Sequence, residues 1–264
     1  GARKAFTRAL ELKPDFLPAV ANLARLDIAD KQVEAARKRY DDFIAKNPKS
    51  SQAYLQYAEF LATTGSQPRD VQALLDKGLA AVPTALPIRM ALVRMLVQSG
   101  DPKRALQLAQ EASVASPDEP SVLELLGRAQ VAAGEMQQAL STYTKLSARL
   151  PGSPAPLVAL ADLQAASKDL SGAEQSLRKA LAVKPDTVEA QQRLIAILIN
   201  SKRGDEAIAI AKDIQKQRKD AAVGFVLEGE LLAATGKKTE AVNAHVEAYK
   251  RDKSPQSFVR LHSA

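Results

Sequence analysis

Six prolines recur along the chain at a nearly constant interval, and this period constrains the fold more than any other feature of the sequence. Successive members are 34 or 35 residues apart, and they are Pro14, Pro48, Pro83, Pro117, Pro151 and Pro185. A fixed period of this length indicates a solenoid, in which each repeated unit packs only on its neighbours. Because a solenoid presents a long surface rather than a deep pocket, we expect the chain to hold a partner.

Aligning the chain on these prolines reveals recurrent small and bulkier positions. Small residues stand twelve positions before the prolines, at Ala2, Ala36, Val71, Ala105, Ala139 and Ala173. Bulkier or apolar residues stand eight positions before them, at Phe6, Tyr40, Leu75, Ala109, Tyr143 and Leu177. Since residues four apart share one face of a helix, both sets belong to one face of a helix, and this helix ends before the proline.

An earlier set of positions predicts a second helix in each unit. Apolar pairs stand there, for example Leu23/Ala24, Tyr57/Ala58, Leu92/Val93 and Leu160/Ala161. Between the two sets a glycine often recurs, at Gly65, Gly100, Gly134 and Gly236. Glycine readily adopts the left-handed conformation that closes a helix, and proline disfavours its continuation. Each unit is therefore predicted to contain a helix, a tight turn, a second helix and a proline stop.

This pattern resembles the tetratricopeptide repeat (TPR) family, whose unit is about 34 residues long. The resemblance covers essentially the whole chain and implies an all-α fold, a right-handed superhelical solenoid of antiparallel helix pairs. Lys219 and Lys253 replace the expected proline in the last two units, and Gln191 replaces a usual apolar residue. The predicted single solenoid, 1–264, comprises a half-repeat (1–16), repeats 17–50, 51–85, 86–119, 120–153, 154–187, 188–221 and 222–255, and a partial helix (256–264).

The incomplete first and last units suggest that the chain is part of a longer protein. Solenoids need polar capping units, so we expect any dimer to arise from uncapped ends. No apolar run approaches the ~20 residues that span a bilayer. Contact with a membrane is thus expected only through an anchor outside residues 1–264. The absence of cysteine excludes disulfides and thiolate metal sites.

The composition and the histidines argue against an enzyme. His245 occupies the bulky second-helix position, where packing is expected, and His262 has no metal-ligand partner in the sequence. No phosphate-cradling glycine loop and no nucleophile motif occur. We therefore expect no catalytic residues, no metal and no cofactor. The net charge of +7 is concentrated in residues 1–50 and 201–264, without a continuous basic stripe or stacking aromatics, so no nucleic-acid partner is expected.

The TPR resemblance also implies a binding surface. In such arrays the first helix of each unit lines the concave wall, through its second, fifth, sixth, ninth, twelfth and thirteenth positions. A protein or peptide ligand is thus expected there, with Arg94 and Arg128 adjacent and able to grip a carboxylate or phosphate, unless they pair with Glu124. The predicted groove residues are Arg25, Leu55, Glu59, Met90, Arg94, Glu124, Arg128, Val158, Asp162, Gln192, Val226 and Glu230. The Lys and Asn clamp of chaperone-tail binders is not matched as a set.

A narrower resemblance concerns residues 224–237 (GFVLEGELLAATGK) and 260–262 (RLH). They look like TPR lipoproteins of bacterial PEP-CTERM/exosortase systems, which pair exopolysaccharide production with sorting of exported proteins. This resemblance implies a lipid-anchored protein of the periplasm or outer membrane that acts in envelope assembly. Without it, a cytoplasmic location is equally compatible with the sequence.

Two other functions fit the same sequence. The array could be a passive structural spacer between an N-terminal anchor and a C-terminal module, although Leu55 and Met90 in the predicted groove argue against a purely polar wall. Alternatively, its basic ends could bind an anionic polymer such as a polysaccharide. That binding would depend steeply on salt concentration.

Overall fold

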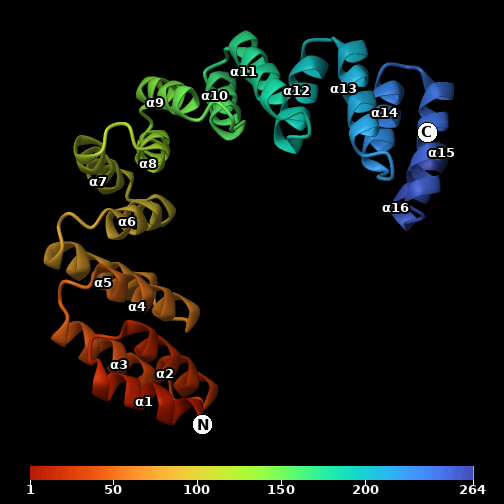
Figure 1. The fold of residues 1–264 in the computed structure, drawn as a ribbon. Coiled ribbons are helices and arrows are strands. Elements are labelled where there is room, and N and C mark those ends of the chain that lie inside the picture. The colour runs from red at the N-terminus through yellow and green to blue at the C-terminus, as the bar shows by residue number, and fades with distance from the viewer. Residues whose placement is uncertain (264) are drawn as a thin grey trace. The chain divides into compact units, whose positions relative to one another are not determined.

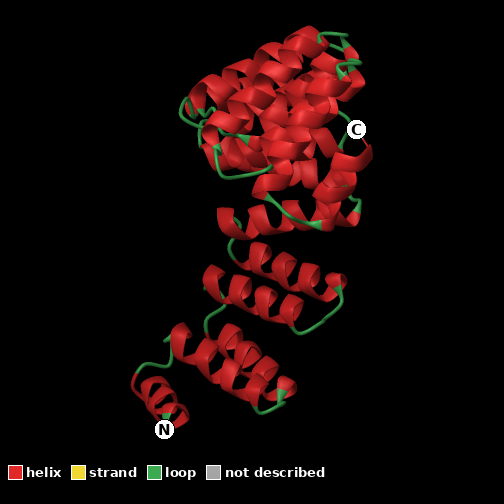
Figure 2. Ribbon diagram, turned by 90° about the vertical axis from the view of Figure 1, so that its right-hand side faces the viewer, coloured by secondary structure: helices red, strands yellow, loops and turns green. Residues whose placement is uncertain are grey.

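The computed structural model describes residues 1–263, and side chains as far as residue 259. Every regular element in this part of the chain is an α-helix (Figures 1 and 2). The helices are α1 (Ala2–Leu12), α2 (Leu17–Ala29), α3 (Val33–Lys46), α4 (Ser51–Thr63), α5 (Pro68–Ala81), α6 (Leu86–Ser99), α7 (Pro102–Ala115), α8 (Pro120–Ala132), α9 (Met136–Arg149), α10 (Ala155–Ala166), α11 (Leu170–Val183), α12 (Val188–Asn200), α13 (Gly204–Gln217), α14 (Val223–Ala234), α15 (Lys238–Arg251) and α16 (Pro255–Ser263). The prediction of an all-α helical repeat solenoid is confirmed.

The helices alternate between two roles along the chain. We call α2, α4, α6, α8, α10, α12 and α14 the first helices, and α1, α3, α5, α7, α9, α11, α13 and α15 the second helices. Each predicted repeat range holds one helix of each kind, and α16 begins at Pro255, the final residue of the range 222–255. The division into seven repeats stays a prediction, and residue 264 of the predicted partial helix lies outside the described residues.

The chain forms two compact parts, each of which contains several repeats. We call Gly1–Ala139 the first unit and the part from Leu140 onward the second unit. In the first unit each helix from α1 to α8 packs on its neighbour in sequence, and α4 also contacts α6, which contacts α8. In the second unit the helices from α10 to α16 pack consecutively. Each unit has its own core of buried apolar side chains.

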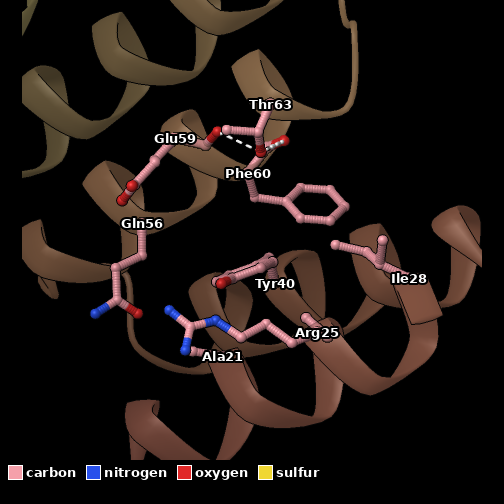
Figure 3. A pocket seen from close by; sticks show the side chains of 9 residues that line it. Ala21, Arg25, Ile28, Tyr40, Gln56, Glu59, Phe60 and Thr63 are labelled. Atoms are coloured by element: carbon pink, nitrogen blue, oxygen red, sulfur yellow. Dashed lines mark hydrogen bonds between the residues drawn. The ribbon is translucent and has the colours of Figure 1, made fainter.

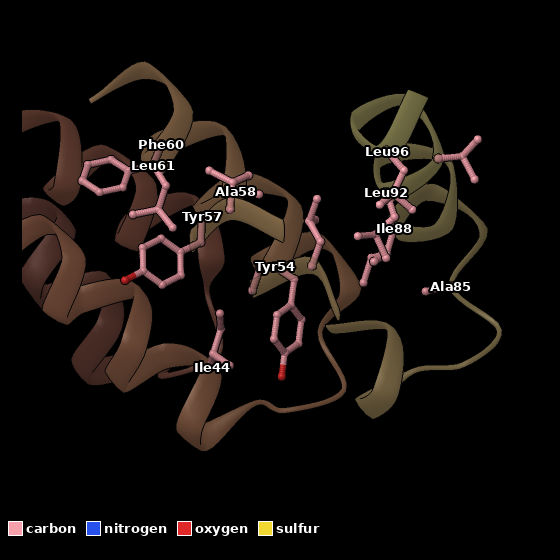
Figure 4. Packing of buried hydrophobic residues seen from close by; sticks show 14 of the residues in the cluster. Ile44, Tyr54, Tyr57, Ala58, Phe60, Leu61, Ala85, Ile88, Leu92 and Leu96 are labelled. Carbon is pink, nitrogen blue, oxygen red and sulfur yellow. The ribbon is translucent and has the colours of Figure 1, made fainter. Parts of the chain in front are cut away.

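Small residues allow the helices to approach closely. Six of the alanines that stand twelve positions before the prolines or their equivalents have no exposed surface, whereas Ala2 of the half-repeat is exposed; the six are Ala36, Ala105, Ala139, Ala173, Ala207 and Ala241. At Gly78 an added Cβ would lie 2.7 Å from Cγ of Tyr54 and 3.0 Å from Cδ1 of Ile88, so only glycine fits between these side chains (Figure 4). These contacts fix where α4, α5 and α6 cross.

The half-repeat α1 is fastened to the first complete helix pair by a buried carboxylate. The side chain of Asp27 on α2 is only 1% exposed and accepts hydrogen bonds from Arg3 of α1 (2.5 Å) and from Arg39 of α3. Burial raises the pKa of Asp27, but the bonds from Arg39 and Arg3 outweigh it and lower the pKa below its ordinary value. Asp27 therefore stays ionised and connects three helices.

The tight turn between first and second helix has the same backbone conformation seven times. Its left-handed residue has φ between 59° and 82° at Lys31, Gly65, Gly100, Gly134, Lys168, Lys202 and Gly236. The sequence pattern revealed only the four glycines, because lysine gives no turn signal. A side chain with a Cβ is strained in this conformation by roughly 1 kcal/mol, so the three lysines weaken the fold locally.

None of the helices in the described part of the chain is both long and apolar enough to cross a bilayer.

Replacing a turn lysine with glycine should stabilise the protein. We expect Lys31→Gly, Lys168→Gly and Lys202→Gly each to raise the free energy of unfolding by about 1 kcal/mol, because glycine adopts positive φ without strain. Chemical denaturation followed by circular dichroism measures this change. The matched control is Gly65→Lys, where an added Cβ meets nothing within 4 Å and only the backbone strain is introduced. Equal stability of all four variants would contradict this explanation.

Candidate functional site

All twelve predicted groove residues lie on first helices. Eight of them are exposed, namely Arg25, Glu59, Arg94, Glu124, Arg128, Asp162, Gln192 and Glu230. Leu55, Met90 and Val226 are half-buried, and Val158 is 9% exposed. The polar members thus face solvent, whereas Leu55 and Met90 pack against the core of the first unit and offer only part of their surface.

A pocket of about 320 Å³ lies between α2, α3 and α4 (Figure 3). We call it the Tyr40 pocket. Tyr40 of α3 and Phe60 of α4 form its apolar side, with ring centroids 5.5 Å apart. The first helices supply Ala21, Arg25, Gln56, Glu59 and Thr63, which occupy fifth, ninth, sixth, ninth and thirteenth positions of their repeats. The small side chain of Ala21 leaves the space open. Two predicted groove residues, Arg25 and Glu59, are therefore brought into one hollow.

Arg25 and Glu59 carry opposite charges but do not pair. In the part of the chain with described side chains, neither forms a side-chain hydrogen bond or an ion pair. Both act on the hydroxyl of Tyr40, whose pKa is raised by burial, lowered by Arg25 and raised by Glu59. Figure 3 shows Arg25 and Glu59 on different helices with Tyr40 between them. The pocket therefore keeps two charged groups available to a ligand.

Of the two arginines predicted to bind a ligand, Arg128 is engaged in an ion pair with a described side chain and Arg94 is not. Arg128 donates to the carboxylate of Glu124 one turn earlier on α8, at 2.5 Å. Such an exposed pair is worth roughly 0.3–0.5 kcal/mol, so a ligand can compete for it at little cost. Arg94 on α6 is exposed, and among the described side chains it has no hydrogen-bond or ion-pair partner. Since α6 and α8 are in contact, both arginines lie on the same wall of first helices.

The second unit has a pocket of its own, of about 580 Å³, between α10 and the start of α12. The predicted groove residues Val158 and Asp162 line it, together with Ala155, Ala159 and Glu189. Asp162 accepts a hydrogen bond from Nε of Arg193 on α12 at 2.6 Å, which links two successive first helices. Arg193 is the sixth residue of the repeat range 188–221, so it also stands at one of the groove positions.

The polar residue that breaks the repeat pattern is accommodated inside the second unit. Gln191 is 2% exposed, and its amide group donates to the carbonyl of Pro185 at 2.7 Å and to Oε1 of Gln217 at 2.9 Å. These bonds satisfy the amide nitrogen, whereas Oε1 of Gln191 is buried without a hydrogen-bond partner in the described part of the chain, which costs stability. Its neighbour Gln192 is exposed.

The histidine whose side chain the structure describes, His245, is packed inside the second unit. The buried ring of His245 lies so close to Gly229 that an added Cβ there would be 2.6 Å from it, which is a packing role. The side chain of His262 lies outside the described residues. Within the described chain, no group of three or more His, Cys, Asp or Glu residues could hold a metal ion.

The aromatic side of the Tyr40 pocket is the feature that sequence reasoning missed. Tyr40 belongs to the predicted packing face of a second helix, and it does stack on Tyr57 with ring centroids 5.1 Å apart. Its other edge contributes to the pocket because the facing positions on α2 are alanines. The combination of a large second-helix residue with small first-helix residues was the available signal.

Comparison with known proteins agrees with this architecture. Models described as tetratricopeptide repeat match residues 1–58, 130–192 and 165–224, and another match covers residues 90–154. The chain belongs to the tetratricopeptide repeat family. None of these matching models is an enzyme family, and no curated protein sequence matches the chain.

Several solved structures share the fold at low sequence identity. YrrB, described as a TPR protein with an unusual peptide-binding site, has a TM-score of 0.56 and 22% identity over 72% of this chain and 97% of its own. A tetratricopeptide repeat protein from Parabacteroides merdae has a TM-score of 0.59 and 12% identity, covering 92% and 96%. PilF of Pseudomonas aeruginosa has a TM-score of 0.57 and 14% identity, covering 81% and 96%. At these identities the likeness concerns the fold alone.

Tyr57, which stacks on Tyr40 of the pocket, should ionise at a higher pH than a free tyrosine. Burial and the nearby carboxylate of Asp41 raise the pKa of Tyr57 to about 12. Because this pKa exceeds the ordinary value of about 10, Tyr57 favours the folded state below pH ~10, and this contribution is lost as the pH rises through 12. Phenolate absorbance should contain a component with a midpoint near 12 that Tyr57→Phe removes while the helical signal persists. Loss of a component near 10 instead would contradict the packing described here.

Proposed function

We propose that this TPR protein is a non-enzymatic interaction scaffold that binds a peptide or a helix of a protein partner along its first helices. The observation that carries this proposal is the Tyr40 pocket, where groove positions of two successive first helices surround an open hollow that has unpaired charges and an aromatic side. Peptide side chains need such a combination of apolar surface and free polar groups. The exposed and unpartnered Arg94 extends the same wall on α6.

We propose that the partner belongs to a bacterial envelope assembly that combines exopolysaccharide production with protein export. The support is the resemblance of residues 224–237, which form α14 and the turn at Gly236, to TPR lipoproteins of PEP-CTERM systems. The identity of the captured partner tests this context separately from binding itself.

The spacer function receives less support than the scaffold. A spacer has no use for unpaired charges inside a hollow, and Arg25 and Glu59 are such charges. Binding of an anionic polymer is also less supported, because the Tyr40 pocket combines one positive and one negative side chain. The two alternatives make different predictions in the experiment below.

Charge reversal on the first helices should release the partner. We expect Arg25→Glu/Arg94→Glu to reduce cross-linked recovery of a specific protein from host extract by at least about tenfold, because each change replaces an available cation with a repelling anion. The matched control is Lys77→Glu/Lys103→Glu, which makes the same change in charge at exposed positions of the second helices α5 and α7.

Three outcomes separate the functions. Loss of the partner only from the first-helix variant supports the scaffold, and a partner without any envelope role contradicts the proposed context alone. Equal recovery by wild type and both variants contradicts groove binding and favours the spacer. Equal loss from both variants, with recovery that falls steeply as salt rises, favours an anionic polymer.

A further inference from the structure

We infer that the Tyr40 pocket selects a partner segment in which an apolar side chain is flanked by one acidic and one basic residue, in a single charge order. The acidic residue contacts Arg25 on α2, the basic residue contacts Glu59 on α4, and the apolar side chain packs on Tyr40 and Phe60. This inference rests on the proposed function and specifies the chemistry of its ligand.

The two opposite charges of the Tyr40 pocket are kept separate from each other. Arg25 and Glu59 line one pocket, yet they form no ion pair with each other or with any other described side chain. Other exposed pairs of opposite charge in the first unit behave differently, since Lys38 reaches Asp42 on α3 and Arg128 reaches Glu124 on α8. Two opposite charges kept apart across a hollow are matched best by a ligand that carries the opposite charges at the same separation.

The surface of the Tyr40 pocket between Arg25 and Glu59 is apolar. Tyr40 and Phe60 are 4% and 6% exposed and present only a small part of each ring to the pocket, and Ile28 of α2, which is 37% exposed, adds to its apolar lining. Burial of an apolar side chain against such rings contributes roughly 25 cal/mol per Å² removed from water. A segment with two charges and no apolar residue between them would leave this surface wet.

The positions of the two charges also fix the direction in which a peptide segment binds. Arg25 is on α2 and Glu59 is on α4, so the two charges belong to successive repeats and are not interchangeable. A bound segment therefore has its acidic side next to α2 and its basic side next to α4. The net charge of this pair is zero, which separates the pocket from a general anion-binding site. Charge order rather than total charge is the expected determinant of binding.

The test uses a library of short random peptides displayed on phage and selected on three full-length proteins. They are the wild type, the exchange variant Arg25→Glu/Glu59→Arg, and the control Lys38→Asp/Asp42→Lys. Both variants conserve net charge, and the control exchanges an exposed pair on α3 whose members already bond at 3.3 Å. The strongest wild-type peptide is then synthesised with a twin in which its acidic and basic residues are exchanged.

The wild type and the control should bind the selected peptide about tenfold more tightly than its twin, and the exchange variant should reverse this preference. The neutral variant Arg25→Gln/Glu59→Gln should bind both peptides equally, which keeps the test decisive if the exchange variant does not fold. A peptide and twin that bind the exchange variant with the wild-type preference would overturn the inference.

Different results of this peptide selection would overturn the inference and the proposed function. Peptides that are enriched, lose binding in Arg94→Glu and ignore every change at Arg25 and Glu59 would overturn the inference while the scaffold stands. No enrichment over an uncoated surface on any of the proteins would contradict peptide binding itself, and the inference with it.

Discussion

The close approach of neighbouring helices at fully buried alanines is the constraint on which the rest of the structure depends. Ala36 and Ala105 have no exposed surface, and Gly78 leaves no space for even a Cβ between Tyr54 and Ile88. Because these small residues recur at the repeat period, each second helix meets its neighbours at the same level. The packing leaves one face of every first helix without a partner inside the unit. The candidate binding surface is that remaining face.

The same constraint explains why some positions tolerate irregular residues. Three lysines adopt the left-handed conformation in the turns because the helices on either side are held by their buried alanines. Gln191 is buried in the core of the second unit because Pro185 and Gln217 accept its hydrogen bonds. In the first unit the carboxylate of Asp27 is enclosed but balanced by Arg3 and Arg39. Local hydrogen bonds thus compensate the burial of Asp27 and of the amide nitrogen of Gln191, whereas Oε1 of Gln191 has no partner among the described residues.

The fold was accessible from sequence because a repeat averages over individual residues. The recurrent prolines, alanines and glycines predict helices, turns and their faces, and the groove rule selects Arg25 and Glu59, which lie on α2 and α4. Pairing between side chains was less accessible. Arg193 bonds Asp162 across two repeats, and Tyr40 borders the pocket only because Ala21 is small. Such contacts depend on three-dimensional spacing, which a period along the sequence does not contain.

Site-specific photo-cross-linking in the host tests the central claim, that the first helices carry the binding surface, most directly. A photoreactive phenylalanine derivative replaces the exposed Ala62 of the first helix α4, at a groove position outside the pocket lining, in one protein and the exposed Lys77 of the second helix α5 in another. We expect a discrete cross-linked protein from position 62 and none from position 77. An adduct from position 77 alone, or no adduct from either position, would contradict the claim that the first helices carry the binding surface.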